Sequence, residues 1–227
     1  NIHYCRKIRI YPNTQQHILF SKCFGTSRFI YNNCVTVLNN FYKNKLNEIN
    51  ANKLNGCIHF DKQNNQCCGT IFNNNFCKKH KKNKIKWDLP LTLPSLRPLA
   101  MKNNKDLKED ELWQKEIPYD TRQLSVKSFI GNVKSCLSNK KNGNINNFKL
   151  NYKSKRNNKQ IFFLNKKAIP SGLNIFKTKL KKKAKLRTRT KYNKIYKNYK
   201  PTSDCSILKD YNKYYLLIPK TRDTEYI

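Results

Sequence analysis

Apolar and polar positions divide the chain into a helical first half and a second half of short strands. Residues 7–10 alternate, with Ile8 and Ile10 between two cations, which is typical of a strand that ends at Tyr11-Pro12. Next, Asn13 and Gln16 have the spacing of a capping box, which predicts that a helix begins there. Glycine often ends a helix, so we expect Gly25 to end this one.

A second helix is expected from about Ser27, and a third after Asp120, which is expected to cap it, with Gly143 beyond its end. Apolar residues at three- and four-residue spacings define the buried faces. These are Ile18, Leu19 and Phe24 in the first helix, Ile30, Cys34, Val37, Leu38 and Phe41 in the second, and Leu124, Val126, Ile130, Val133 and Leu137 in the third.

From Phe148 onward the apolar period shifts towards two. The stretches FKLNYKSK, QIFFL, GLNIF, KLRTR, CSIL and KYYLLI are short strand candidates separated by polar turns. This spacing suits a small barrel or sandwich, and the isolated first strand is expected to pair with these later ones.

The fold class predicted from these patterns is α+β, a small β-barrel interrupted by a helical domain. Residues 1–12 supply the first barrel strand, 13–145 the helical insertion, and 146–227 the remainder of the barrel. An Asn-rich segment at about 51–84 interrupts the helical part. The last residues, TEYI, resemble a strand that is cut short, so a longer protein is expected.

Charge changes the picture most. Lys and Arg number 48 against 13 Asp and Glu, a formal net charge of +35. No carboxylate lies between Asp120 and Asp204, a gap of 83 residues that holds 24 of the cations. Self-repulsion at this level destabilises a compact chain unless a polyanion neutralises it, so nucleic acid is the expected partner. An AT-rich genome would raise the frequency of Lys and Asn, but it would not remove acidic residues from long stretches of the chain.

Inside the Asn-rich segment, a span of 24 residues contains the four cysteines and the histidine of a possible metal site. The span ends with a Cys-x-x-His pair. That spacing lets two side chains reach one tetrahedral zinc ion, and a metal would supply the folding energy that so polar a segment lacks. Four free cysteines in a loop are the alternative, and His59 is a rival ligand. The predicted ligands of a structural zinc are Cys57, Cys67 (with Cys68 as an alternative), Cys77 and His80.

Catalytic chemistry has little support in these residues. The acids are scattered or lie in the cluster KEDE, and neither a glycine-rich phosphate loop nor a Ser/His/Asp arrangement is evident. An odd number of cysteines, nine, favours a reducing intracellular compartment over a disulfide scaffold. We expect Cys5, Cys23 and Cys34 to pack as small apolar residues, and this chain alone not to be an enzyme.

The stretch KIRIYPNTQQHILFSKCFGTSRFIYNN resembles the start of the TnpB family of transposon-encoded proteins. Its Tyr-Pro turn, Gln, Gly break and Arg-Phe-x-Tyr-Asn helix correspond to that signature. IPYDTRQLSVKSF, FKLNYKSKRN and KYYLLIP resemble later family segments, and the cysteine-rich insertion resembles the eukaryotic and giant-virus branch, the Fanzor proteins.

The resemblance implies an RNA-guided DNA endonuclease. A wedge barrel and a helical recognition domain would grip the guide RNA and the double-stranded DNA target, with no membrane partner, and a RuvC-type domain would cut with Mg²⁺. The chain stops where the first catalytic Asp would stand, so no catalytic residue is carried over. Localisation would be the nucleus of a eukaryotic host for a Fanzor-like protein, otherwise the cytoplasm.

The candidate nucleic-acid contacts come from three stretches in which cations and aromatics mix. They are Arg28, Tyr31 and Asn32; Lys153, Lys155 and Arg156; and Lys181, Lys182, Lys183, Lys185, Arg187, Arg189, Tyr192 and Tyr196. Packing is the alternative for Tyr31 and Asn32, and a solvated hairpin for the last group. Two rival functions remain: a stand-alone zinc-containing DNA-binding regulator or transposase accessory protein, and a ribosome-associated or structural RNA-binding protein.

Overall fold

The computed structural model describes residues 2–54 and 89–222. The chain divides into two compact units, one comprising Asn1–Cys34 with Leu91–Ile227 and the other Val35–Pro90. The long helix α1 (Thr14–Leu54) passes from the first unit into the second. The first unit holds the sheet and both groups of candidate contacts that lie beyond residue 150.

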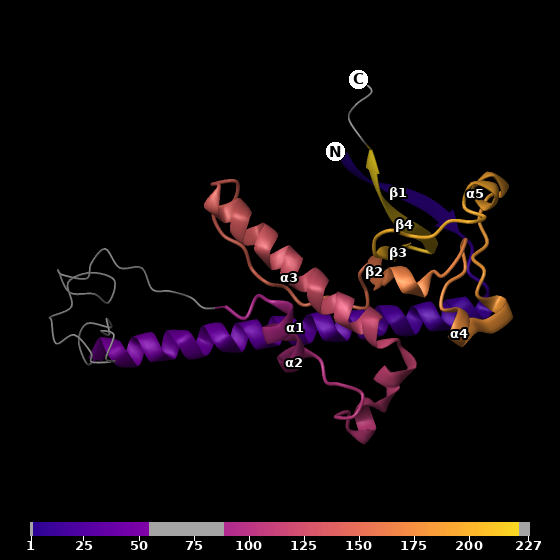
Figure 1. Ribbon diagram of the computed structural model, residues 1–227. Helices are drawn as coiled ribbons and strands as arrows, with labels where there is room; N and C mark the ends of the chain where they lie inside the picture. The colour runs from indigo at the N-terminus through magenta and orange to yellow at the C-terminus, as the bar shows by residue number, and fades with distance from the viewer. Residues whose placement is uncertain (1, 55–88, 223–227) are drawn as a thin grey trace. The chain divides into compact units, whose positions relative to one another are not determined.

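The first unit is built on an antiparallel sheet of four strands in the order β1-β4-β3-β2 (Figure 1). The first strand of the chain pairs along its length with the last described one, which places Ile8 opposite Leu216 and Arg9 opposite Tyr215. The helical residues between β1 and β2 are therefore an insertion into the sheet. The strand bounds are β1 Ile2–Ile10, β2 Lys159–Leu164, β3 Cys205–Asp210 and β4 Lys213–Arg222.

In the described part of the chain this sheet is open, whereas the sequence led us to expect a small barrel. QIFFL, CSIL and KYYLLI form β2, β3 and β4, but FKLNYKSK forms no strand. GLNIF and KLRTR contribute isolated bridges only, between Asn174 and Lys185 and between Tyr11 and Arg187. Short helices fill this region instead: η2 (Lys166–Ala168), α4 (Lys177–Leu180), η3 (Lys181–Lys183) and α5 (Thr190–Ile195).

One face of the sheet packs against the first turns of α1. The Phe24 and Phe162 rings meet edge-on with centroids 4.9 Å apart, and Phe20 lies 5.6 Å from Phe162 and 6.1 Å from Tyr214. Aromatic side chains of this size bury about 150–250 Å² each, and such ring pairs add about 0.5–1.5 kcal/mol beyond that burial. This aromatic cluster fixes α1 on the sheet.

The start of α1 follows the sequence pattern, but its course does not. The capping box is confirmed: the Asn13 amide donates to Gln16 Oε1 (3.2 Å), and the Gln16 amide donates to Asn13 Oδ1 (3.0 Å). The break expected at Gly25 is wrong, since the helix continues through it. A helical glycine costs only about 1 kcal/mol relative to alanine, which burial of the neighbouring Phe24 offsets. Ile18, expected in the core, is 52 % exposed.

The remaining helices of the first unit are α2 (Leu93–Ala100), the 3₁₀ helix η1 (Glu109–Glu116) and α3 (Tyr119–Lys141). Pro118, not Asp120, is the N-cap of α3, and Asp120 lies in the first turn, where a carboxylate favours the helix dipole. Val126, Phe129 and Ile130 are buried on α3. Within the described residues, no helix combines the length and apolar content needed to cross a bilayer.

Candidate nucleic-acid interface

The sheet face opposite the core carries cations and tyrosines. Side chains alternate along a strand, so burial of Ile8 and Leu216 turns their neighbours to the other face. Those neighbours are Lys7 and Arg9 on β1 and Tyr215 on β4. The amphipathic pattern of two paired strands therefore produces one cationic, aromatic surface.

This surface forms an open groove of about 530 Å³, which we call the sheet groove. Strands β1 and β4 and the chain around α5 line it. Among its described lining residues are four cations and three tyrosines, and none is a carboxylate. The lining residues are Lys7, Arg9, Tyr11, Arg189, Tyr192, Lys213 and Tyr215.

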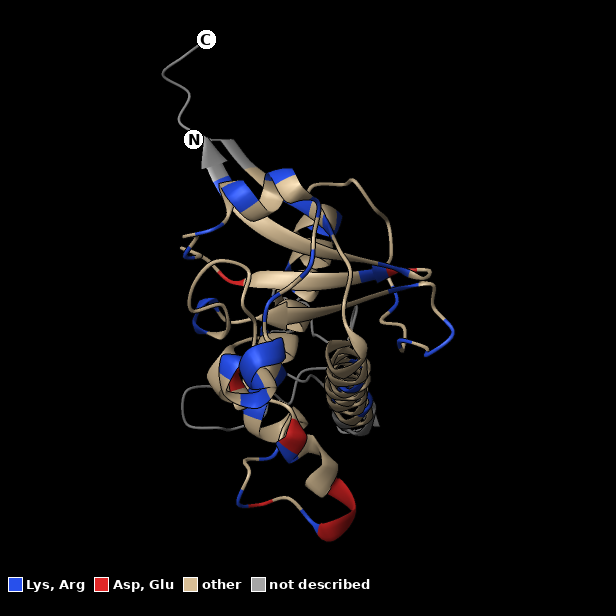
Figure 2. Ribbon diagram, turned by 90° about the vertical axis from the view of Figure 1, so that its right-hand side faces the viewer, with Lys and Arg blue, Asp and Glu red and all other residues tan. Residues whose placement is uncertain are grey.

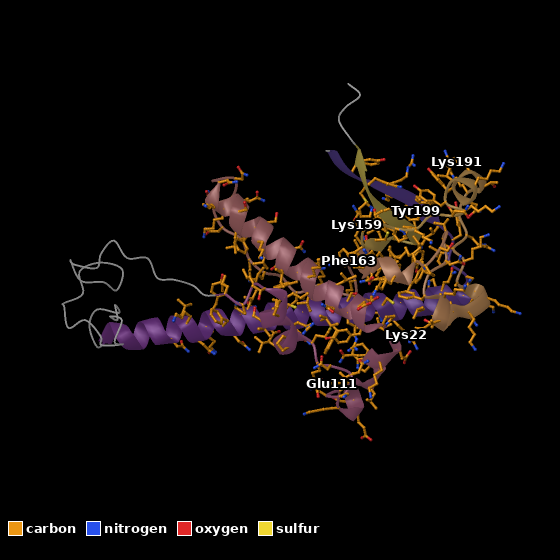
Figure 3. The ribbon with its side chains drawn as sticks, viewed as in Figure 1. Lys22, Glu111, Lys159, Phe163, Lys191 and Tyr199 are labelled. Atoms are coloured by element: carbon orange, nitrogen blue, oxygen red, sulfur yellow. The ribbon has the colours of Figure 1, made fainter. Side chains whose placement is uncertain are left out.

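The cations of the groove lie over its rings. Lys7 Nζ is 4.0 Å from the Tyr215 ring centroid, and the Arg9 guanidinium is 5.2 Å from Tyr215 and 5.4 Å from Tyr11. Lys191 on α5, which is labelled in Figure 3, does not line the groove, but its Nζ lies 5.2 Å from the centroid of the Tyr192 ring. Such contacts hold the charged groups at the groove surface, and Lys7 Nζ also lies 3.9 Å from Asp210 Oδ2.

Arg9 carries a donor that the fold does not use. Its Nη1 atom is buried and has no hydrogen-bond partner among the described residues. A buried donor without a partner costs about 1–3 kcal/mol, more for a charged group. An anion that enters the groove would remove this cost, so the site favours a phosphate-bearing ligand.

Backbone contacts fix the walls of the groove. The Tyr11 amide donates to the Arg187 carbonyl (2.8 Å), and Thr188 Oγ1 donates to the Arg9 carbonyl (2.8 Å). The segment before α5 is thus tied to the end of β1, and Arg189 at the N-cap of α5 lies beside the strand cations.

The predicted cationic run at residues 181–189 is anchored rather than a loose hairpin. Ala184 and Leu186 enter the core, and Gln16 Nε2 donates to the carbonyls of Lys183 (2.8 Å) and Lys185 (2.9 Å). The alternating side chains are exposed as a consequence. Those exposed cations are Lys181, Lys182, Lys183, Lys185, Arg187 and Arg189.

The two predicted tyrosines of this region differ in their setting. Tyr192 is half-buried and lines the sheet groove, as a stacking residue must. Tyr196 is only 2 % exposed, and its ring centroid is 5.1 Å from that of Tyr199. The structure therefore places Tyr196 in the core, where its ring has no face to offer a base, in contrast to the prediction.

The fold brings together two predicted groups that are far apart in sequence. Asn32 Nδ2 donates to the Lys153 carbonyl (3.1 Å), while the Lys153 amide donates to Asn32 Oδ1 (2.8 Å). Lys153 Nζ lies 3.8 Å from the Tyr31 ring centroid, and that ring packs edge-on against Phe129. Tyr31 and Asn32 thus hold the loop at residues 149–158. This role agrees with the alternative given from the sequence, in which both residues pack inside the protein instead of contacting nucleic acid.

Burial shapes the ionisation of this cluster. It lowers the pKa of Lys153 and raises the pKa of the Tyr31 hydroxyl, both because the charged form loses hydration. Lys155 and Arg156 lie in the same loop and are exposed. The loop therefore presents two solvated cations and one cation, Lys153, that burial disfavours in the absence of an anion.

The predicted zinc ligands Cys57, Cys67, Cys68, Cys77 and His80 lie outside the described residues, and so does most of the Asn-rich segment. Within residues 2–54 and 89–222, no group of three or more His, Cys, Asp or Glu side chains is placed to hold a metal ion. The zinc site remains a prediction from spacing.

Sequence patterns missed five residues of the sheet groove: Lys7, Arg9, Tyr11, Lys213 and Tyr215. Part of the signal was present, because KIRIY alternates Ile with Lys, Arg and Tyr. The patterns predicted that the first strand pairs with later strands, but not that β4 is its partner or in which register, and this pairing makes the two polar halves one surface.

Comparison with known families gives one match, over residues 5–46, to the model HTH_OrfB_IS605, described as a helix-turn-helix domain. In the structure this stretch comprises most of β1 and a continuous part of α1, without a turn between two helices. No curated protein matches the chain. Over residues 5–46, therefore, the match supports a DNA-binding, transposon-associated protein of the IS605 OrfB/TnpB type.

Proposed function

We propose that this chain is the nucleic-acid-gripping part of a TnpB- or Fanzor-type RNA-guided DNA endonuclease, with guide RNA and target DNA as partners. The observation that carries the proposal is the sheet groove, with four cations, three tyrosines and the buried, unpartnered Nη1 of Arg9. Cations bind the phosphates and rings stack on unpaired bases, which is how single strands are held.

In this proposal the chain binds and does not cut. The wedge role belongs to the sheet and the recognition role to the inserted helices. A structural zinc in residues 51–84 would support the insertion, and Mg²⁺ would act only in a nuclease domain beyond this chain. Metal analysis tests the zinc directly, with about one equivalent per chain expected.

Variants of Tyr215 and Lys213 distinguish the contribution of ring stacking to RNA binding from the contribution of charge in the sheet groove. Tyr215→Leu is expected to weaken binding of a single-stranded RNA about tenfold, because stacking contributes about 1–3 kcal/mol per base. Tyr215→Phe keeps the ring and should bind within about twofold of the parent chain. Lys213→Gln should flatten the plot of log affinity against log salt by about one unit. Affinity measured by fluorescence anisotropy over a salt series gives all three values.

Lys140→Gln is the matched control, because Lys140 is an exposed cation in the last turn of α3 and does not line the groove. If Tyr215→Leu binds like Tyr215→Phe, or Lys213→Gln like Lys140→Gln, the groove is not the interface.

A second candidate function is double-stranded DNA binding without RNA, by a zinc-containing regulator or transposase accessory protein. The helix-turn-helix description of the matched family model favours it. Competition distinguishes the two: unlabelled RNA should displace a bound RNA at lower concentration than duplex DNA of equal length. The reverse order would support the second function.

A further inference from the structure

A second, smaller pocket lies on the same unit, between the first half of α1, the loop at residues 149–158 and the start of β2. Its volume is about 120 Å³, close to that of cavities that hold a benzene-sized molecule. Phe24 forms part of its wall. The pocket therefore has room for one small chemical group rather than for a whole nucleotide.

Three cations from three segments line this pocket: Arg28 on α1, Lys153 in the loop and Lys159 at the start of β2. Of these, Lys159 is labelled in Figure 3. None of the described residues that line it is acidic. Burial lowers the pKa of Lys153, and its ammonium lies over the Tyr31 ring, with Nζ 3.8 Å from the ring centroid. An anion in the pocket would add a charged partner for it.

Ser27 provides an independent observation. Its side chain lines the pocket, is 7 % exposed, and its Oγ atom is buried without a hydrogen-bond partner in the described structure. Leaving a buried hydroxyl unpaired costs about 1–3 kcal/mol. The fold thus retains a polar atom here that only a ligand or a water would satisfy.

The pocket is already organised. Arg28 Nη1 donates to Gln160 Oε1 (3.3 Å), and Gln160 Nε2 donates to the Lys155 carbonyl (3.0 Å). The two hydrogen bonds between Asn32 and Lys153 hold the loop from its other side. The loop and the guanidinium therefore keep their positions before any ligand arrives, which lowers the entropic cost of binding.

The geometry points to a binding site for one phosphate group, held by Arg28, Lys153, Lys159 and the hydroxyl of Ser27. A tetrahedral dianion or monoanion accepts hydrogen bonds on every side, which matches a pocket lined by donors. The choice of a nucleic acid as the source of this phosphate rests on the proposed function. It is either an internal phosphate of the strand or a 5′-terminal monophosphate.

Thermal unfolding of the full chain tests the pocket with inorganic phosphate as the probe. A ligand that binds only the folded state stabilises it by RT ln(1 + [ligand]/Kd), so the effect grows with the logarithm of concentration once the site is saturated. Phosphate should raise the Tm of the parent chain above its value in chloride at equal ionic strength. Ser27→Ala and Lys159→Gln should each lose most of this shift, while Lys140→Gln keeps it. Without phosphate, Ser27→Ala should be at least as stable as the parent, because it removes the unpaired hydroxyl.

Binding of two RNAs of identical sequence, one with a 5′-phosphate and one with a 5′-hydroxyl, identifies the source. A loss of about tenfold in Ser27→Ala for the phosphorylated RNA alone assigns a terminal phosphate, and an equal loss for both assigns an internal one. If Ser27→Ala and Lys159→Gln match Lys140→Gln in every measurement, the pocket is not a phosphate site. If phosphate raises the Tm of the parent chain but the chain binds neither RNA, the phosphate pocket is supported and the proposed function is overturned.

Discussion

Polar side chains at the start of α1 hold the fold together as much as they offer contacts to a ligand. Gln16 is fully buried and uses its amide to fix two carbonyls of the cationic run. Asn32, which the sequence marks as a base-reading candidate, grips the backbone of Lys153. A side-chain amide resembles a peptide group, so it satisfies loop backbone that lacks a strand partner. Sequence patterns identify such residues but do not show which partner they take.

Three glycines give a graded test of backbone strain. Gly172 has φ +58°, and a Cβ there would lie 2.8 Å from the Lys197 carbonyl oxygen, so Gly172→Ala should destabilise the fold by about 2 kcal/mol or more. Gly143 has φ +75° but open space, so Gly143→Ala should cost less. Gly131 is helical and unobstructed, and Gly131→Ala should stabilise by up to about 1 kcal/mol.

Urea denaturation of the three variants checks this order. The explanation for Gly172 fails if its alanine variant is as stable as the parent chain, or if Gly143→Ala is the more destabilised of the two.

Burial of the Cys34 thiol leads us to expect that the fold loses stability at alkaline pH. Burial raises the pKa of its thiol from 9.0 to about 12. Above pH 9 the unfolded chain releases this proton while the folded chain keeps it, so the unfolding free energy falls as pH rises from 9 towards 12 and is unaffected below 9. The decline should be shallower in Cys34→Ala. Equal slopes for both chains, measured by denaturation at pH 8, 9 and 10, would contradict this assignment.

At the scale of elements, the sequence predicted most local signals and the pairing of the first strand with later ones, but not which strand is its partner or in which register. The capping box places the start of α1 correctly, and the alternation in CSIL and KYYLLI places β3 and β4. The break at Gly25 fails because burial of α1 against the sheet outweighs the glycine's weak preference. Register between β1 and β4 depends on residues some 200 positions apart, and no local pattern encodes it. The sequence therefore showed the alternating residues of β1 but not the groove that β1 and β4 form together.

The loop at residues 149–158 has no strand partners of its own in the described structure, so Asn32 is expected to be its main clamp. Asn32→Ala removes both hydrogen bonds to Lys153 and should destabilise the chain by about 1–2 kcal/mol. It should also weaken RNA binding, since Lys153, Lys155 and Arg156 lose their fixed positions. Asn32→Asp keeps the acceptor and loses the donor, so an intermediate effect is expected.

Denaturation and RNA titration of the two variants provide the comparison, with Asn33→Ala as the control because Asn33 bonds the Ala100 carbonyl instead. RNA affinity equal to that of the parent in Asn32→Ala would show that this loop plays no part in binding.

At the scale of the whole molecule, charge dominates. The formal net charge is +35, and Figure 2 shows Lys and Arg spread over the segments around the sheet, with one group of acidic residues on η1 and others scattered elsewhere. Composition alone predicts a polyanionic partner, and the fold adds two places where we propose that phosphates bind, the sheet groove and the Ser27 pocket. The nature of the polyanion is the part of the proposal that rests on the family resemblance and on the match at residues 5–46.

The most direct test is the salt dependence of RNA binding by the purified, nucleotide-free chain. Contacts to about six phosphates at about 0.7 ions released per phosphate predict a slope of about −4 in log affinity against log salt, measured between about 50 and 200 mM. That result, with binding at the lowest salt, would establish that the chain binds a nucleic-acid strand mainly through contacts between its cations and the phosphates. A slope near zero, or no binding to any RNA or DNA at about 50 mM salt, would contradict the account.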